Sequence, residues 1–429
     1  MTVSIGIDFG TTNSVIALLG EDGRVATARF RAGIEMLDVF RSVLCFWTEE
    51  HRAGRRLHHA AGPPAIEAYL DDPLDSRLMM SLKTYLAQKS FTETRVFGRP
   101  FTLEQLVSLF LRALFGEARI SLRDARVVAG RPVHFAGEFA DDTLGESRLR
   151  GSYAEAGLEQ LEVAFEPEAA GYRFARTLTT AATVLIGDFG GGTSDFSVLR
   201  FEPGRPNRVL PLGHAGIGVA GDVFDYRIID RVISPRLGKG DTYTVMKKEL
   251  PVPPEYFSAF ARWHRLSLMR TPRTLREISE VARTAAHPER LRGLITLIQD
   301  ELGYRLYQTV SAAKAALSSE PSARLTFRHK QVTIDEVLTR ADFETWIAGD
   351  LRRIAETIDR ALTASRVEAH RIDQVFLTGG TSFVPAVRRL FDERFGNERV
   401  TAGGEFVSVA EGLALIGRDR AQPSSKPAS

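Results

Sequence analysis

Residues 184–199 read VLIGDFGGGTSDFSVL, in which three consecutive glycines separate two apolar runs. The pattern predicts two β-strands joined by a tight turn, because glycine enters backbone conformations that other residues avoid. Successive free N–H groups in such a turn form an anion-binding nest. Asp188 enters the turn and Asp195 leaves it, and carboxylates repel a bound phosphate unless a cation lies between them. The stretch therefore predicts a site for phosphate together with Mg²⁺.

The same pattern occurs at the start of the chain, where residues 3–19 read VSIGIDFGTTNSVIALL. Two similar hairpins far apart in a sequence indicate two similar halves, which would hold the phosphates of a nucleotide from both sides. One glycine turn alone is commonly an ordinary hairpin, but both copies place Asp-Phe-Gly after an apolar strand. A third glycine turn, in residues 374–387 (QVFLTGGTSFVPAV), predicts a strand followed by a helix.

Composition places the chain among globular proteins with more than one domain, since it has 429 residues, 44% of them hydrophobic and 26% charged. The net charge of +2 is too small to imply a nucleic-acid partner. Cys45 is the single cysteine, which excludes an internal disulfide and fits a reducing compartment. The sequence shows no signal-peptide pattern and no apolar run long enough to cross a bilayer. We therefore expect a cytoplasmic protein that does not enter the membrane.

Two charged residues outside the turns are candidates for the same site. Lys83 lies in an apolar segment, where a compact ammonium suits contact with phosphate or an attacking water, although a surface lysine can cover apolar neighbours in the same way. Glu166 precedes Pro167 where a strand is expected to give way to a helix, and it could reach a metal-bound water or only favour the helix dipole. The basic, histidine-containing segment 51–59 is interpreted as a solvated loop rather than a metal site.

Several further elements follow from the pattern of apolar residues. Residues 103–118 repeat leucine, valine and phenylalanine at helical spacing and predict an amphipathic helix. Residues 213–221 are interpreted as a glycine-rich turn, and residues 235–320 as largely helical. The Pro/Ser-rich tail 421–429 is expected to be disordered.

The order of these motifs, from the first turn through Glu166 to the second and third turns, resembles the actin-like ATPase superfamily over residues 1–417. Within it, the motifs resemble most closely the ATPase domain of the 70-kilodalton heat-shock chaperones. The resemblance implies an α/β protein with two similar lobes, each a β-sheet flanked by helices, and a nucleotide in the central cleft. Lobe I would comprise residues 1–180, with a core of 1–34 and 101–180 and a small subdomain of 35–100. Lobe II would comprise residues 181–420, with a core of 181–220 and 341–420 and a small subdomain of 221–340.

The resemblance also implies roles for individual residues. Phosphate contacts would come from the two turns: Gly10, Thr11, Thr12, Asn13, Gly190, Gly191, Gly192 and Thr193. Mg²⁺ would be positioned, chiefly through its waters, by Asp8, Glu166 and Asp188. Catalysis would involve Lys83, at the place of the family's catalytic lysine, with Glu166, Thr193 and Asp195, the last two orienting the attacking water. The nucleoside would contact Lys314, Ser318, Gly379, Gly380, Ser382 and Phe383.

Three positions depart from the family's nucleoside pocket. The family places a glutamate and an arginine where this chain has Ser311 and Ala315, and an arginine where it has Phe383. A phenylalanine can still stack on a base, but the preference for adenine is less firmly predicted than phosphate binding.

The function implied is that of an ATP-binding protein that hydrolyses ATP with Mg²⁺ and acts as a monomeric nucleotide switch for a protein client or co-chaperone. The chain ends soon after its last expected helix, so we expect it to lack the family's peptide-binding domain. Three alternatives remain open from the sequence: a small-molecule kinase of the same fold, an ATP-dependent filament-forming protein, and a degenerate pseudo-ATPase, given the altered nucleoside pocket.

Overall fold

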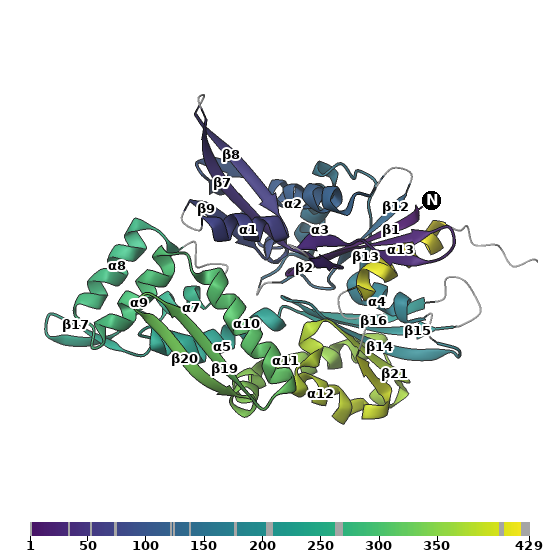
Figure 1. Ribbon diagram of the computed structural model, residues 1–429. Coiled ribbons are helices and arrows are strands. Elements are labelled where there is room, and N and C mark those ends of the chain that lie inside the picture. Colours follow the sequence, from purple (N-terminus) through teal and green to yellow (C-terminus); the bar gives the residue numbers. More distant parts are fainter. Residues whose placement is uncertain are drawn as a thin grey trace, which may run out of the picture. The chain divides into compact units, whose positions relative to one another are not determined.

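The computed structural model describes residues 2–32, 35–51, 54–72, 75–120, 122, 125–136, 139–175, 178–202, 209–261, 269–402 and 407–421. The chain forms two compact units (Figure 1). Unit 1 comprises Met1–Asp71, Leu78–Gly221 and Leu351–Ser429, and unit 2 comprises Asp72–Arg77 and Asp222–Asp350. The expected tail at residues 421–429 lies outside the described residues, apart from Ala421 at the end of a helix.

Unit 1 contains two sheets with the same topology. The first has the order β13-β12-β1-β2-β3, with β6 (Phe40–Arg41) also pairing with β2. Its strands are β1 (Thr2–Phe9), β2 (Asn13–Gly20), β3 (Val25–Thr27), β12 (Arg126–Arg131) and β13 (Glu162–Phe165). The second has the order β22-β21-β14-β15-β16. Its strands are β14 (Ala182–Phe189), β15 (Ser194–Phe201), β16 (Val209–Ile217), β21 (Gln374–Thr378) and β22 (Val400–Ala402).

The pairing within the two sheets is also the same. In each sheet the first strand pairs antiparallel with the second through a glycine turn and parallel with a strand much later in the chain. The third strand is antiparallel to the second, and the last strand is parallel to its neighbour. The structure thus confirms the duplicated sheet, and it places both copies in one compact unit.

The structure describes seven helices in unit 1: α1 (Pro63–Asp71), α2 (Leu103–Ala118), α3 (Asp142–Glu155), α4 (Glu166–Ala175), α11 (Arg340–Ser365, which begins in unit 2), α12 (Pro385–Phe395) and α13 (Ser408–Ala421). Helix α2 has the predicted bounds. It begins with a capping box, in which Thr102 accepts from the backbone of Gln105 and the side chain of Gln105 accepts from the backbone of Thr102.

Helices α4 and α13 each follow one of the two sheets in the chain but pack on the other. Helix α4 follows the last strand of the first sheet in the chain but packs on β14 and β15 of the second. Helix α13 follows the second sheet but packs on β1, β2 and β12 of the first, and the two helices also contact each other (Figure 1). A shared apolar cluster that includes Val128, Ala169, Val184 and Leu413 joins both sheets through this helix pair.

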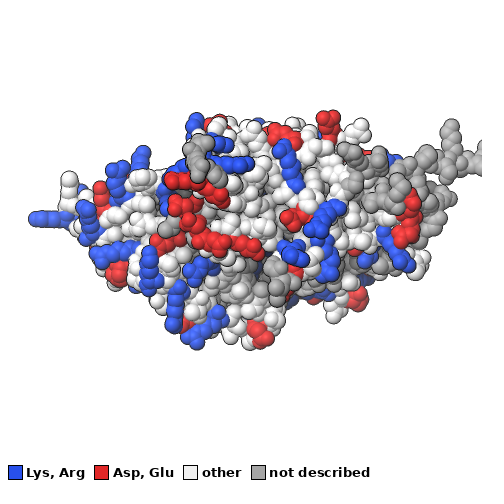
Figure 2. Space-filling model, turned by 45° about the horizontal axis from the view of Figure 1, so that its top comes forward, with Lys and Arg blue, Asp and Glu red and all other residues white. Residues whose placement is uncertain are grey.

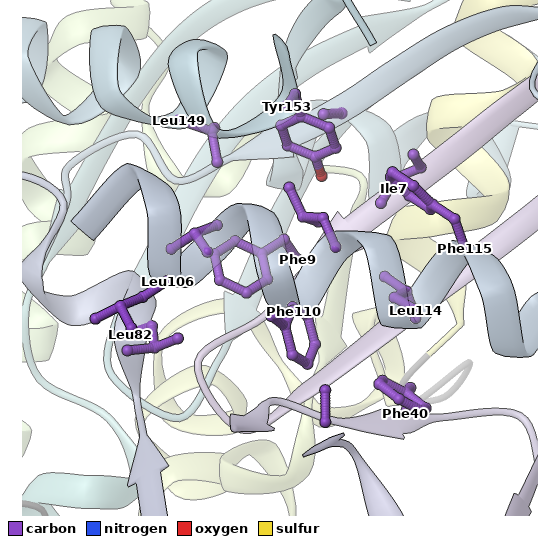
Figure 3. Packing of buried hydrophobic residues seen from close by; sticks show 14 of the residues in the cluster. Ile7, Phe9, Phe40, Leu82, Leu106, Phe110, Leu114, Phe115, Leu149 and Tyr153 are labelled. Carbon is purple, nitrogen blue, oxygen red and sulfur yellow. The ribbon is translucent and has the colours of Figure 1, made fainter. Parts of the chain in front are cut away.

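A larger apolar cluster lies on the other face of the first sheet. Figure 3 shows Phe9 beside Leu106 and Phe110, with Tyr153 and Ile7 in the same cluster. The ring centroids of Phe9 and Phe110 are 5.4 Å apart. Because side chains alternate along a strand, burying Ile7 and Phe9 on this face turns the intervening Asp8 to the opposite one.

The remaining strands of unit 1 form small sheets. They are β4 (Phe30–Ala32) with β5 (Glu35–Leu37), β10 (Thr94–Val96) with β11 (Arg99–Phe101), and β8 (Gly54–Ala61) with β7 (Val43–His51) and β9 (Ser76–Met80, which begins in unit 2). The short 3₁₀ helix η1 (Leu82–Tyr85) follows β9. Three further 3₁₀ turns lie near the third glycine turn: η4 (Ala369–Arg371), η5 (Gly380–Phe383) and η6 (Asn397–Arg399).

Unit 2 combines helices with two hairpins. Its helical segments are α5 (Gly221–Ile228), the π-helical η2 (Ile229–Ile233), α6 (Ser234–Arg236), α7 (Glu255–Phe260), α8 (Pro272–Arg283), α9 (Pro288–Gln299) and α10 (Gly303–Ser319). The hairpins are β17 (Thr242–Val245) with β18 (Lys248–Pro251), and β19 (Ser322–His329) with β20 (Val332–Thr339). The expectation that residues 235–320 are largely helical therefore missed the β17–β18 hairpin.

Two expectations about loops are wrong. Residues 54–61 form a strand rather than a solvated loop, because β8 pairs with β7 and Trp47 stacks on His58 with ring centroids 5.8 Å apart. Residues 213–217 belong to β16 rather than to a turn. Their glycines serve close packing: a Cβ at Gly213 would collide with the backbone of Ser365.

The surface carries charges of both signs (Figure 2), as the small net charge of the sequence leads us to expect. Lys and Arg side chains alternate with Asp and Glu over the face in Figure 2. Among the described residues, none of the helices is both long enough and apolar enough to cross a membrane.

Candidate active site

The two glycine turns lie opposite each other in unit 1. The second turn is closed by a hydrogen bond from Gly190 N to Thr193 O of 2.9 Å. A Cβ built on Gly192 would lie 3.4 Å from Oγ1 of Thr11, which belongs to the first turn. The structure therefore brings together two turns that are about 180 residues apart in the sequence. They lie close to each other because Gly192 has no side chain to separate them.

Four carboxylates and one lysine lie next to these turns: Glu166, Asp188, Asp195 and Lys83 are buried, and Asp8 is half-buried. Asp8 and Asp188 occupy equivalent places, each the second-last residue of the strand that enters its turn. Glu166 is the first residue of α4, and its Oε1 lies 2.5 Å from Nζ of Lys83. Asp195 lies directly opposite Asp188 in the β14–β15 pair. Catalytic and metal-positioning candidates named from the sequence thus converge in one place.

The carboxyl groups of this cluster have altered acidity. Burial, followed by the charge of Glu166, raises the pKa of Asp8 from 3.8 to about 7, although Lys83 opposes the shift. Burial and Glu166 likewise raise the pKa of Asp195 to about 7. Burial, Glu166 and Asp8 raise the pKa of Asp188 well above its usual value. The cluster therefore holds more negative charge than Lys83 alone balances.

Lys83 is a buried lysine, with 7% of its surface exposed, so the alternative of a surface lysine covering apolar neighbours is wrong. It lies on η1, which follows Ser81 in a left-handed conformation (φ 55°). Burial lowers the pKa of Lys83, but the charges of Glu166 and Asp8 outweigh this and raise it. Lys83 is therefore a cation at neutral pH.

Backbone groups that sequence reasoning missed hold Asp195 in place. Its Oδ1 accepts hydrogen bonds from Val133 N (2.8 Å) and His134 N (3.3 Å), on the segment after β12. The side chain of Thr193 also bonds to Asp195. A Cβ at Gly216 would collide with Asp195 Oδ1, so this glycine leaves room for the carboxylate. The signal in the sequence was the glycine itself, which we interpreted as part of a turn.

A glycine contact of the same kind supports Glu166. A Cβ at Gly130, on β12, would lie 2.9 Å from Cγ of Glu166. Glu166 is also the N-terminal residue of α4, so its placement suits the helix dipole as well as the pairing with Lys83.

The third glycine turn packs against the second. Gly379 has a φ of +85°, and a Cβ there would collide with the carbonyl of Phe189. The hydroxyl of Ser382 is buried and donates to Gly379 O (2.6 Å), so it closes its own turn. Phe383 has 45% of its surface exposed. The loop therefore presents an aromatic ring and a glycine backbone beside the phosphate turns.

Lys314 and Ser318, the other nucleoside candidates, lie on α10 of unit 2. Nζ of Lys314 lies 2.9 Å from Oδ2 of the fully buried Asp225. The ion pair gives Lys314 a structural role that the sequence did not reveal, and the proposed contact with a nucleoside stays a prediction.

The acidic cluster suits a hydrated cation better than a directly ligated one. Among the described residues, no three His, Cys, Asp or Glu side chains are close enough to ligate one ion together. The shared repulsion of Asp8, Asp188 and Asp195 nevertheless indicates uncompensated charge that a cation would relieve. Mg²⁺ commonly keeps several of its waters in proteins, so these residues fit an ion contacted through water.

Comparison with known proteins agrees with the fold and with the order of the motifs. The pattern of the Hsp70 protein family matches residues 295–418. The chain is 26% identical to the chaperone protein DnaK of Deinococcus radiodurans over 427 residues, covering 97% of this chain and 58% of the relative. The chain is related to the Hsp70 family. DnaK of Thermus thermophilus is 26% identical over 97% of this chain and 60% of its own length, and DnaK of Thermotoga petrophila is 26% identical over 96% and 58%.

The similarity supports the resemblance to this family and to the actin-like ATPase fold that the motifs indicated. The chain spans only 58–60% of the length of these curated relatives. The lobe boundaries and the expected lack of a peptide-binding domain stay predictions. The same holds for the location in the cytoplasm, for the monomeric state and for the role of each site residue.

Proposed function

We propose that this Hsp70 relative binds ATP with Mg²⁺ at the two facing glycine turns and hydrolyses it slowly, as a nucleotide switch for a protein partner. The observation that carries the proposal is the close approach of Gly192 to Thr11 beside the buried Lys83–Glu166 pair. A shared ligand explains why two glycine turns and a buried lysine lie in one place.

The turns would hold the phosphate chain from both sides. Thr11, Thr12 and Asn13 offer hydroxyl, amide and backbone donors from the first hairpin, and Gly191 to Thr193 offer backbone N–H groups from the second, since the N–H of Gly190 closes the turn. The absence of a side chain at Gly192 leaves the space beside Thr11 open to a phosphate oxygen. ADP would bind through the same donors after hydrolysis.

The acidic cluster would hold Mg²⁺ through its waters, with Asp8, Glu166 and Asp188 accepting hydrogen bonds from them. The ion, when bound, would neutralise phosphate charge and align the phosphate oxygens. The raised pKa values of Asp8 and Asp188 reflect the repulsion that such a cation would remove.

Hydrolysis would depend on positioning rather than on a covalent intermediate. Asp195 is held by two backbone amides and by Thr193, and its carboxylate would accept a proton from an attacking water. Lys83 would stabilise the charge that develops on the transferred phosphoryl group.

Calorimetric titration of ATP and ADP, each with and without Mg²⁺, tests the proposal. We expect both nucleotides to bind and Mg²⁺ to strengthen binding. Adenosine, which lacks phosphate, serves as the control and is expected to bind far more weakly. Equal binding of adenosine and ATP, or the same affinity with and without Mg²⁺, would contradict the assigned site.

Turnover assays then separate the switch from its alternatives. ADP release from ATP in water alone supports hydrolysis, whereas release that requires an added metabolite would indicate a kinase. ATP-dependent sedimentation would indicate a filament. A change in protease sensitivity between the ATP and ADP states would support a switch, and identical cleavage patterns would contradict it.

A further inference from the structure

Thr84 follows Lys83 on η1, and its backbone is fixed on both sides. Thr84 N donates to Ser81 O (3.0 Å), and Nε2 of Gln88 donates to Thr84 O (3.0 Å). Ser81 holds a left-handed conformation to begin this turn. The turn that delivers the lysine therefore also fixes the direction of the Thr84 side chain.

The hydroxyl of Thr84 is buried and has no hydrogen-bond partner among the described residues. Burying a hydroxyl without a partner is unfavourable, and buried polar groups in native proteins are usually paired. An unpaired hydroxyl on a backbone held this firmly indicates a partner that is not part of the chain.

The surroundings of the hydroxyl identify that partner. A Cβ at Gly192 would lie 3.7 Å from Thr84 Oγ1 and 3.4 Å from Thr11 Oγ1. The hydroxyls of Thr84 and Thr11 thus both lie beside the position that a side chain at Gly192 would occupy. Backbone N–H groups only donate and a hydroxyl can also donate, so an acceptor suits this place, and a phosphate oxygen is the acceptor proposed for the turns.

We propose that Thr84 Oγ1 donates a hydrogen bond to an oxygen of the phosphate chain held between Thr11 and Gly192. The inference rests on the proposed function, because it needs a nucleotide at the two turns. Thr84 then contacts the ligand from a third element of unit 1, so that η1 supplies a neutral donor in addition to the charge of Lys83.

The test compares Thr84→Val, which keeps the shape of the side chain but removes the hydroxyl, with Thr84→Ser, which keeps the hydroxyl. Binding of ATP, ADP and adenosine is measured by calorimetry in the presence of Mg²⁺. We expect Thr84→Val to weaken ATP or ADP binding by about tenfold or more and to leave adenosine binding unchanged. Thr84→Ser should stay within about threefold of the unmodified protein.

Thermal unfolding without nucleotide provides a second measurement. If the Thr84 hydroxyl had a purely structural role, removing it would lower the melting temperature. Removing an unpaired hydroxyl should leave the melting temperature of Thr84→Val unchanged or raise it. Ser234→Ala is the matched control, since Ser234 on α6 of unit 2 also has a buried hydroxyl without a partner among the described residues. It should leave nucleotide affinity unchanged.

The outcomes separate the two proposals. If the unmodified protein binds no nucleotide, the proposed function fails and the inference fails with it. If the unmodified protein binds ATP and ADP and Thr84→Val binds them equally well, only the inference is overturned. A lower melting temperature in Thr84→Val that Thr84→Ser restores would show a structural hydrogen bond and would also overturn it.

Discussion

Gly192→Ala is the sharpest test of the facing turns, because it adds a single methyl group where a phosphate is expected. The new Cβ would lie 3.4 Å from Thr11 Oγ1 and 3.7 Å from Thr84 Oγ1, which are ordinary contact distances. The backbone at Gly192 is not left-handed, so alanine fits without strain. Replacing glycine at such a position typically stabilises a protein by about 0.4–1 kcal/mol, because the unfolded chain loses freedom.

Binding should change in the opposite direction. The methyl group would occupy the space beside Thr11 and keep a phosphate oxygen from the backbone N–H groups of the turn. A hydrogen bond to a charged group contributes about 1.5–3 kcal/mol, so losing one such bond weakens binding about tenfold or more. Calorimetry with ATP and urea unfolding of the same preparation measure the two effects.

The matched control is Gly116→Ala, in the last turns of α2. A Cβ there would meet nothing within 4 Å, so this variant should gain stability of about 1 kcal/mol and keep its nucleotide affinity. The reasoning is refuted if Gly192→Ala binds ATP as tightly as the unmodified protein. It is also refuted if Gly192→Ala loses stability while Gly116→Ala gains it, since the space between the turns would then be filled by the protein.

Three further predictions concern charge. Lys83→Met should lower the free energy of unfolding by about 3–5 kcal/mol, because it leaves buried Glu166 without its partner, and it should abolish single-turnover hydrolysis. Urea unfolding should show that adding Glu166→Gln to Lys83→Met recovers part of the lost stability. A double variant as unstable as Lys83→Met would contradict the pairing. Asp8→Asn should reduce the gain in ATP affinity from Mg²⁺ by about 10- to 100-fold, and calorimetry that shows an unchanged gain would exclude Asp8 from the ion's water shell. Burial raises the pKa of Asp300, but hydrogen bonds from Lys330 and His329 outweigh it and hold that pKa below 3.8. The stability that ionised Asp300 contributes is therefore present at neutral pH and is lost as the pH falls through this lowered pKa. Unfolding measured against pH should show the stability difference between the unmodified protein and Asp300→Asn shrinking in acid, and a constant difference would contradict the sign.

The fold was predictable from the sequence because its strongest signals are local. Each strand that enters a glycine turn is mostly apolar, and the repeat of Asp-Phe-Gly indicated that the two hairpins are copies. The amphipathic helix at 103–118 was predicted with its observed bounds because its apolar spacing coincides with a capping box. In these cases local preference and tertiary packing favour the same structure.

The errors arose where a residue type has more than one physical use. The glycines of 213–221 were interpreted as turn formers, but Gly213 and Gly216 lie in β16 and make room for Ser365 and Asp195. A glycine that permits close approach and one that permits a left-handed turn look the same in a sequence. Only the register of β15 and β16 distinguishes them.

The candidate site was predictable in its acidic and basic members but not in its supports. Lys83 stood out because an ammonium within apolar sequence needs a reason. Its partner Glu166 is 83 residues away, and no spacing rule joins the two. The backbone amides of Val133 and His134, which hold Asp195, have no signature in the sequence because every residue except proline carries the same N–H group.

The meeting of the two turns depends on glycines that lie outside both turns. Helix α13 crosses to the first sheet and lies so close to β1 that a Cβ at Gly6 would collide with the backbone of Ala410, while a Cβ at Gly412 would collide with the backbone of Ala169 on α4. Side chains at the contact set the distance between packed elements, so a larger residue at either glycine would push α13 away from the strand or from α4. Gly6 and Asp8 lie on the same face of β1, since side chains alternate along a strand. The packing that draws α13 onto that face therefore also sets where Asp8 lies relative to the second sheet, so the geometry of the candidate site depends on helices α4 and α13.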